Sequence, residues 1–229
     1  MKYFNLTTIK KALYRIYEGN THEHRTSSAS SGLLHNYFPI EKFIITPEQT
    51  QIISGRRPDY SVEKFENNEL VFHLFVEVKS LINSNFSLIL DQLHDTILTA
   101  VDYTGGSFAV FVVAMKGSKI AFFQFCSYVS LLDEYGITHY NGFIPLNYRI
   151  PYEIFQSINN TSNLVDYLSY IQRYNLITQE DALIRLGVEG TKNLPFPHIW
   201  DLLNKDHENH VHDLFLHVAN NKPGLDIVD

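Results

Sequence analysis

Two acidic residues and one lysine occur at matching ends of a predicted β-hairpin. Asp59 precedes a predicted strand at Tyr60–Phe65, and Glu77 and Lys79 end the next predicted strand, Leu70–Ser80. Because antiparallel strands bring these ends together, the two carboxylates and the ammonium group are expected to converge. Two oxygen ligands with open coordination positions suit Mg²⁺ or Mn²⁺. A lysine beside them can hold an attacking water or offset charge on phosphorus, which suits hydrolysis of a phosphodiester bond.

The predicted strand Leu70–Ser80 changes character along one face only. Its even positions from Leu70 to Val78 are all apolar, whereas its odd positions begin apolar and end with Glu77 and Lys79. Residues two apart in a strand point the same way, so these two side chains share a face, and His73 is expected on that same face. An amphipathic helix is predicted at Ser87–Tyr103.

The rest of the chain supplies the elements that hold this hairpin. Phe108–Met115 is a continuous apolar run, typical of a central strand buried on both faces. Further elements are predicted as a helix from Thr7 or Thr8 to about Glu18, a polar loop over residues 20–33, short strands at Lys42–Thr46, Thr50–Ser54 and Ile120–Phe125, and helical patterns at Ile154–Ile158, Leu164–Tyr174, Thr178–Leu186, Trp200–Leu203 and His207–Val218.

This order of elements predicts an α/β fold with a mixed central sheet flanked by helices. We expect residues 1–130 to form the core. Residues 131–229 are expected to form a helical extension that packs on the core and is not an independent domain.

The motif residues resemble those of a known enzyme superfamily. The segment Arg57-Pro58-Asp59-Tyr60, followed after the hairpin by Phe75-Val76-Glu77-Val78-Lys79-Ser80, is similar to the motif of the PD-(D/E)XK nucleases. The resemblance covers roughly residues 1–126 and implies a restriction-endonuclease-like core. It implies a metal-dependent endonuclease, with DNA favoured over RNA as the substrate, and a homodimer is compatible with it.

The resemblance also assigns roles to individual positions. Asp59 and Glu77 would bind Mg²⁺ or Mn²⁺, and the backbone carbonyl of Val78 would be a further ligand. Lys79 would be the catalytic lysine. These assignments agree with the chemistry expected from the residue types alone.

Several further residues are candidates for the same site. Many members of the superfamily add an acid from the first helix, for which Glu18 is the candidate and Glu23 the rival. Gln92 resembles a glutamine that some members place near the site, and Arg56 and Arg57 are placed to hold a substrate phosphate. A histidine ligand is a third alternative, from His22, His24 or His35.

Composition limits the functions that the chain can have. Its 229 residues carry a net charge of −7, which argues against a protein that coats nucleic acid by charge alone but not against an enzyme acting on it. The acidic balance also keeps an alternative open, in which the protein is an inactive nuclease-fold scaffold for interactions. Metal binding by Asp59 and Glu77 would discriminate between the two functions.

The predicted lack of a membrane helix and of a secretory signal, together with the single cysteine, favours an intracellular protein, cytoplasmic or nuclear. The sequence has no apolar run of the roughly 20 residues that a membrane helix needs, and its first residues do not resemble a secretory signal. The single cysteine, Cys126, cannot form an internal disulfide. Four histidines near the C-terminal end are predicted to be surface residues and not zinc ligands: His207, His210, His212 and His217.

Overall fold

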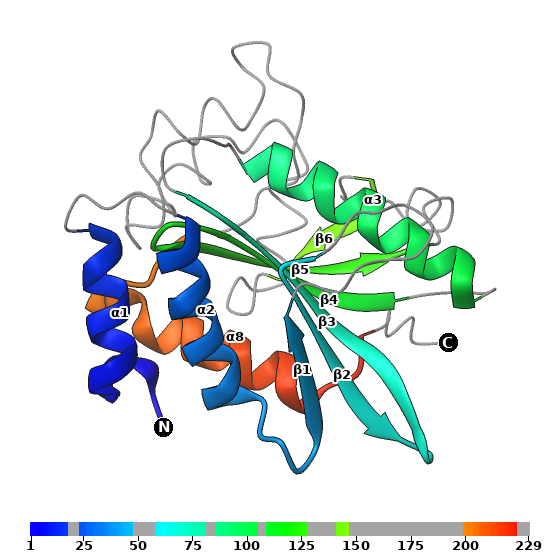
Figure 1. Ribbon diagram of the computed structural model, residues 1–229, viewed down its shortest axis with the longest axis horizontal. Helices are drawn as coiled ribbons and strands as arrows, with labels where there is room; N and C mark the ends of the chain where they lie inside the picture. Colours follow the sequence, from blue (N-terminus) through cyan, green and yellow to red (C-terminus); the bar gives the residue numbers. More distant parts are fainter. Residues whose placement is uncertain are drawn as a thin grey trace, which may run out of the picture.

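A mixed β-sheet with helices on both faces forms the centre of the molecule (Figure 1). The computed structural model describes residues 1–17, 23–47, 58–80, 86–104, 109–127, 141–146 and 199–223. The strands are β1 (Phe43–Pro47), β2 (Tyr60–Glu66), β3 (Glu69–Lys79), β4 (Ala109–Lys116), β5 (Lys119–Cys126), β6 (Phe143–Pro145) and β7 (Trp200–Asp201). They lie in the order β1-β2-β3-β4-β5-β6, with β7 paired to β5. Among these strands only β3 and β4 run parallel.

The helices divide between the two faces of the sheet. They are α1 (Thr7–Tyr17), α2 (Glu23–Tyr37), α3 (Phe86–Thr104) and α8 (Glu208–Asn220), with short 3₁₀ helices η1 (Tyr3–Asn5) and η3 (Lys205–His207). Figure 1 shows α1, α2 and α8 on one face and α3 on the other. Because α3 connects the parallel strands β3 and β4, it serves as their crossover helix. The predicted mixed sheet flanked by helices is confirmed.

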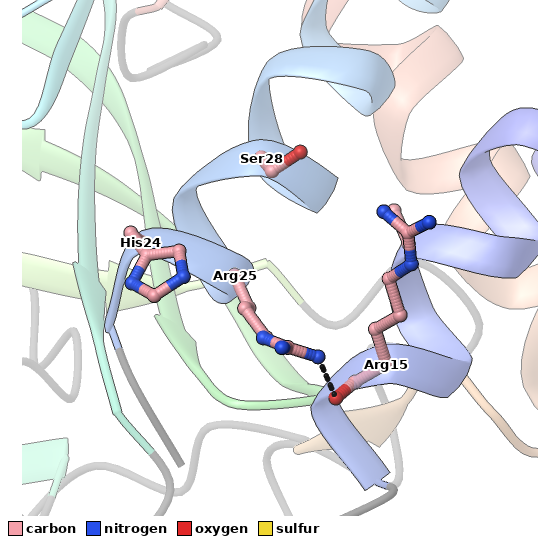
Figure 2. A pocket seen from close by; sticks show the side chains of 5 residues that line it. Arg15, His24, Arg25 and Ser28 are labelled. Atoms are coloured by element: carbon pink, nitrogen blue, oxygen red, sulfur yellow. Dashed lines mark hydrogen bonds between the residues drawn. The ribbon is translucent and has the colours of Figure 1, made fainter. Parts of the chain in front are cut away.

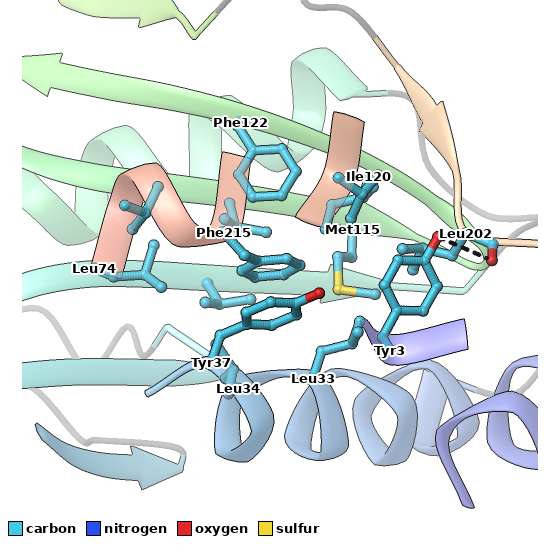
Figure 3. Packing of buried hydrophobic residues seen from close by; sticks show 14 of the residues in the cluster. Tyr3, Leu33, Leu34, Tyr37, Leu74, Met115, Ile120, Phe122, Leu202 and Phe215 are labelled. Atoms are coloured by element: carbon cyan, nitrogen blue, oxygen red, sulfur yellow. Dashed lines mark hydrogen bonds between the residues drawn. The ribbon is translucent and has the colours of Figure 1, made fainter. Parts of the chain in front are cut away.

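The larger core lies between the sheet and α1, α2 and α8. Figure 3 shows Leu33, Leu34 and Tyr37 of α2 facing Phe215 of α8 and the strands. The rings of Tyr37 and Phe215 stack with their centroids 4.5 Å apart. Full burial of one such large apolar side chain contributes about 1.5–3 kcal/mol. The helix α8 is therefore part of this core. Most of the predicted extension 131–229 lies outside the described residues.

The second core lies between the sheet and α3. Phe75 of β3 and Phe123 of β5 meet Ile89, Leu93 and Ile97, which recur along α3 at helical spacing. This face carries the side chains that alternate with those of the first core, because neighbouring residues of a strand point to opposite faces. The strands β3, β4 and β5 are thus buried on both sides, as the run Phe108–Met115 predicted for β4.

Helix α2 includes residues 23–33, where a loop was predicted over residues 20–33. Its buried residues are Thr26, Ala29, Ser30, Leu33, Leu34 and Tyr37, which follow helical spacing. Two of these buried residues, Thr26 and Ser30, are polar, so hydropathy alone does not reveal the helical spacing. The Ser30 hydroxyl donates to the Thr26 carbonyl at 2.9 Å, which satisfies its polar atom within the helix.

A bulge in β3 reverses the direction of His73. Val62 pairs with Leu74 and Glu63 with Phe72, so His73 is an extra residue with no cross-strand partner. It lies against Phe38, Phe43 and Phe111, in the core beneath α8. The prediction that His73 shares a face with Glu77 is therefore wrong, because the bulge shifts the alternation.

The buried His73 side chain makes a testable prediction. Its Nε2 donates to the Val218 carbonyl at 2.7 Å, and burial lowers its pKa to about 4. The unfolded chain takes up a proton below about pH 6.5 whereas the folded chain does not, so His73 contributes stability that is lost as the pH falls from 6.5 toward 4. We expect His73→Phe to cost about 1–3 kcal/mol at pH 7.5, because the Val218 carbonyl loses its donor. Urea unfolding should show this deficit shrinking at pH 4.5, and an equal deficit at both pH values would contradict a neutral buried histidine.

The remaining secondary-structure predictions are either corrected by the structure or fall outside the described residues. Trp200–Leu203 was expected to be helical, but Trp200 and Asp201 form β7 and pair with β5. The predicted strand at 50–54 and the helices predicted between 154 and 186 lie outside the described residues.

No helix in the part of the chain that the structure describes is long and apolar enough to cross a membrane.

Candidate active site

The register of the β2–β3 hairpin brings Asp59 and Glu77 together. Tyr60 pairs with Val76, so Asp59, the residue before Tyr60, lies opposite Glu77. The Val78 N–H donates to Asp59 Oδ2 at 2.6 Å. One residue on, Lys79 Nζ donates to Glu77 Oε1 at 2.6 Å. The structure therefore places both predicted carboxylates and the predicted lysine at one end of the hairpin.

The contact of Val78 with Asp59 also orients the backbone. In an extended strand the N–H and the C=O of one residue point to the same neighbouring strand. Because the Val78 N–H points at Asp59, the Val78 carbonyl lies on the side of Asp59 as well. This is the carbonyl that the sequence resemblance names as a metal ligand.

Glu77 occupies an unfavourable position for a negative charge. Only 4% of the residue is exposed, and its neighbour on β4 is Ala114. Burial, followed by the charge of Asp59, raises the pKa of Glu77 to about 7, although the hydrogen bond from Lys79 acts in the opposite direction. A like charge and a low-dielectric setting thus both oppose ionisation of this carboxyl group.

Lys79 keeps its positive charge at this site. Burial alone would lower its pKa, but the hydrogen bond and the charge of Glu77, together with Asp59 and Glu23, raise it overall. The side chain is therefore an ammonium group at neutral pH. It can donate hydrogen bonds and offset negative charge, but it is not poised to accept a proton.

The first turns of α2 lie beside the hairpin end. Ser27 Oγ and the Tyr60 hydroxyl are 2.7 Å apart, and the Tyr60 hydroxyl donates to the Ser27 carbonyl at 2.8 Å. Glu23, the first residue of this helix, is close enough for its charge to act on Lys79. Of the two rival acids, Glu23 is therefore placed near the site, and Glu18 lies outside the described residues.

Of the remaining candidates that the structure describes, Gln92 and His35 form no hydrogen bond or ion pair with this cluster. Arg56, Arg57 and His22 lie outside the described residues. Gln92 is exposed on α3, and within the described ranges it forms no side-chain hydrogen bond to Asp59, Glu77 or Lys79. His35 hydrogen-bonds to the Ser31 carbonyl. It lies twelve residues beyond Glu23, about 18 Å along the helix, so it cannot serve the same metal ion.

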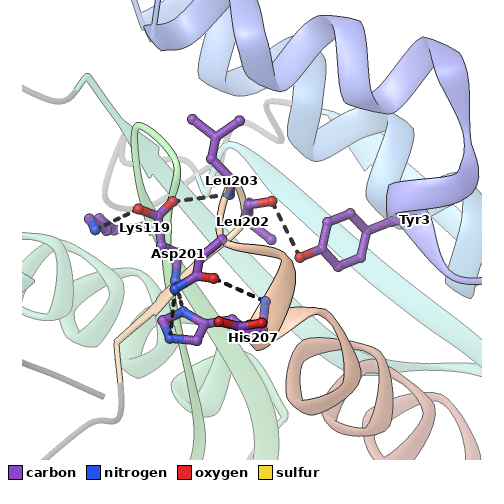
Figure 4. A network of polar contacts seen from close by, with 8 residues as sticks. Tyr3, Lys119, Asp201, Leu202, Leu203 and His207 are labelled. Atoms are coloured by element: carbon purple, nitrogen blue, oxygen red, sulfur yellow. Dashed lines mark hydrogen bonds and ion pairs between the residues drawn. The ribbon is translucent and has the colours of Figure 1, made fainter. Parts of the chain in front are cut away.

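A second charged cluster, which was not predicted, joins β7 to β5 (Figure 4). Asp201 Oδ2 accepts from Lys119 Nζ at 2.7 Å, and Asp201 Oδ1 accepts from the Leu203 N–H at 3.0 Å. Burial opposes ionisation of Asp201, but Lys119 and the other donors outweigh it and lower its pKa. The surroundings of Asp201 thus stabilise its ionised form, as in a structural carboxylate. The surroundings of Glu77 instead disfavour its ionised form.

The same cluster corrects the prediction for the C-terminal histidines. His207 is 6% exposed, and its Nδ1 accepts from the Asp201 N–H at 2.9 Å. It is buried because η3 folds against β7, where its ring also meets Trp200. The other three are half-buried: His210, His212 and His217.

The donor set is compatible with a hard divalent cation that keeps open positions. Among the described residues, no three His, Cys, Asp or Glu side chains converge as a metal site. Two carboxylates and a backbone carbonyl fit Mg²⁺ or Mn²⁺, since Mg²⁺ is usually bound by one or two carboxylates and completes its shell with water and substrate oxygens. A cation there would also relieve the repulsion between Asp59 and Glu77.

No protein-family model matches the sequence, and no curated protein or solved structure shows a significant similarity to the chain. The geometry of the site is thus the basis for the function proposed next.

Proposed function

We propose that this protein is a metal-dependent nuclease of the PD-(D/E)XK type, which hydrolyses phosphodiester bonds of nucleic acid, DNA in preference to RNA. The observation that carries the proposal is the position of Glu77. It is buried, faces the like charge of Asp59 and contacts the ammonium group of Lys79. Carboxylates whose ionisation is opposed by burial and by a like charge are concentrated at functional sites.

The arrangement of the elements supports the same proposal. A helical layer, the three strands β1 to β3, the crossover helix α3 and the parallel strand β4 follow one another along the chain. This is the order of the restriction-endonuclease-like core. The resemblance puts the catalytic residues at the start of the second strand and the end of the third, and Asp59 precedes β2 while Glu77 and Lys79 end β3.

Each residue has a separate role in the proposed reaction. Asp59 and Glu77 would hold Mg²⁺ or Mn²⁺ together with the Val78 carbonyl, and Glu23 is the candidate for an additional acid. A bound divalent cation supplies Lewis-acid stabilisation of charge on the phosphoryl oxygens. Lys79 Nζ, as an ammonium group, positions the attacking water and stabilises the charge that develops on the phosphate.

An inactive scaffold with the same fold is the second candidate function, favoured by the net charge of −7. The buried carboxylate of Glu77 argues against a scaffold, because its ionised form costs stability. A protein that does not use a buried acid gains stability when that acid is replaced. Metal binding separates these two functions, because only the nuclease needs Asp59 and Glu77 as ligands.

We expect Mn²⁺ to bind the protein, and Asp59→Asn and Glu77→Gln each to weaken this binding at least about tenfold. Isothermal titration calorimetry at pH 7.5 measures the effect. Glu69→Gln is a matched control, because Glu69 lies exposed at the other end of β3. Absence of heat with the wild-type protein, or equal binding by Glu77→Gln and Glu69→Gln, would favour the scaffold.

A further inference from the structure

A cationic hollow lies between α1 and α2. It has a volume of about 210 Å³ and is lined by Ala12, Arg15, His24, Arg25 and Ser28. A single water needs only about 10–15 Å³ of such volume, so a phosphate group and several waters fit inside. Figure 2 shows the two arginines and His24 around this space, with Ser28 on the wall formed by α2.

The two arginines that line the hollow come from different helices, Arg15 from α1 and Arg25 from α2. Arg25 Nη1 donates to the Arg15 carbonyl at 3.2 Å, which anchors Arg25 across the gap. In Figure 2 the Arg15 side chain extends along the same gap toward the level of Ser28. Among the described residues neither guanidinium forms an ion pair with a carboxylate. Each arginine carries five N–H donors, and Arg25 uses one of them in this contact.

The surface beside the hollow is also positive, although the whole chain is acidic. Helix α1 contains Lys10, Lys11 and Arg15 and no acidic residue. Lys11 and Arg15 are four residues apart and both exposed, so they share one side of the helix. Tyr14 is 44% exposed between these cations. A local positive surface attracts anionic ligands even though the whole chain has a net charge of −7.

The hollow and the candidate active site share the first turns of α2. Glu23, whose charge acts on Lys79, is followed directly by His24. Ser27, which is bonded to Tyr60, is followed directly by Ser28. A ligand in the hollow therefore lies at the same end of α2 as Glu23, whose charge acts on Lys79, and Ser27, which contacts Tyr60 of β2.

We infer that this hollow binds a backbone phosphate of the nucleic-acid strand that crosses the Asp59–Glu77–Lys79 site, with Arg15 and Arg25 as the main donors. Arginine is suited to this role because its planar donor groups match two phosphate oxygens at once. Contacts of this kind fix the register of a strand without reading its sequence. The choice of nucleic acid as the ligand rests on the proposed function.

Fluorescence anisotropy with labelled single- and double-stranded DNA and RNA tests the inference, in EDTA so that no metal-dependent cleavage occurs. We expect Arg15→Gln to weaken binding about tenfold for every sequence and to reduce the slope of log affinity against log salt by about 1. Lys42→Gln removes the same charge at the opposite end of the sheet, next to β1, and should leave binding unchanged.

A second variant guards against effects on folding. Ser28 is exposed, so Ser28→Glu places a negative charge in the hollow at little cost to the helix, and it should weaken binding more than Ser28→Ala. Equal affinities of Arg15→Gln, Ser28→Glu and Lys42→Gln would overturn the inference, as would failure of the wild-type protein to bind any of the oligonucleotides. If binding falls as expected but no substrate is cleaved with metal, the nuclease proposal fails and the phosphate site stands.

Discussion

Lys79→Ala is expected to lower the rate of metal-dependent cleavage by about 10²–10⁴-fold, the range seen when one charge-stabilising or proton-handling group is removed from an active site. Its Nζ is the ammonium group that donates to Glu77 and on which the charge of Asp59 acts. Single-turnover rates with saturating protein measure the chemical step without a contribution from product release.

Metal binding separates the role of Lys79 from that of the carboxylates. We expect Lys79→Ala to keep its affinity for Mn²⁺ while losing cleavage, whereas Glu77→Gln should lose both. Lys42→Ala is the matched control, because Lys42 is exposed at the far end of the sheet. Cleavage by Lys79→Ala at the rate of Lys42→Ala would show that Lys79 is not catalytic.

Glu77→Gln is expected to make the metal-free protein more stable at pH 8, by about 2–3 kcal/mol. The pKa of Glu77 is raised from 4.5 to about 7 by burial and by Asp59. Between these two pH values the folded chain holds a proton that the unfolded chain has lost. Stability therefore falls as the pH rises from 4.5 to 7, and above pH 7 the folded protein retains the full cost of a buried carboxylate.

The advantage of the glutamine variant must consequently depend on pH. We expect it to shrink to below about 1 kcal/mol at pH 5, where the folded wild-type protein holds Glu77 neutral. His73 titrates in an overlapping range but is present in both proteins, so its contribution cancels in the difference. Urea unfolding in EDTA at pH 5 and pH 8 measures this difference, with Glu69→Gln as the control. If Glu77→Gln were less stable than the wild type at pH 8, this would contradict the raised pKa of Glu77 and the cost of its ionised form.

The arrangement of the hairpin and the sheet could be predicted because it depends on local patterns. The apolar run at β4 identifies a strand that is buried on both faces. The apolar stripe along α3 identifies a helix that is buried on one face. The convergence of Asp59 with Glu77 follows from the pairing of two adjacent strands. Such pairing requires only a short turn, here Asn67 and Asn68, both of which adopt positive φ.

Other features depend on contacts between distant parts of the chain. Helix α2 buries Thr26 and Ser30, which local hydropathy reads as loop residues, and its packing against α8 is not visible in the sequence. The bulge at His73 depends on the fit between β2 and β3 and reverses a side chain that alternation places elsewhere. The hollow between Arg15 and Arg25 requires two helices to meet, so residue types alone do not predict it.

The most direct test of the nuclease proposal is a cleavage assay with the purified protein. Labelled single- and double-stranded DNA and RNA are incubated with Mn²⁺, Mg²⁺ or EDTA, beside Asp59→Asn and the exposed control Asp206→Asn. We expect cleavage with either metal, none in EDTA, a preference for DNA, and loss of activity in Asp59→Asn alone. No cleavage of any substrate by the wild-type protein, or equal cleavage by both variants, would contradict the assignment of this site as a nuclease centre.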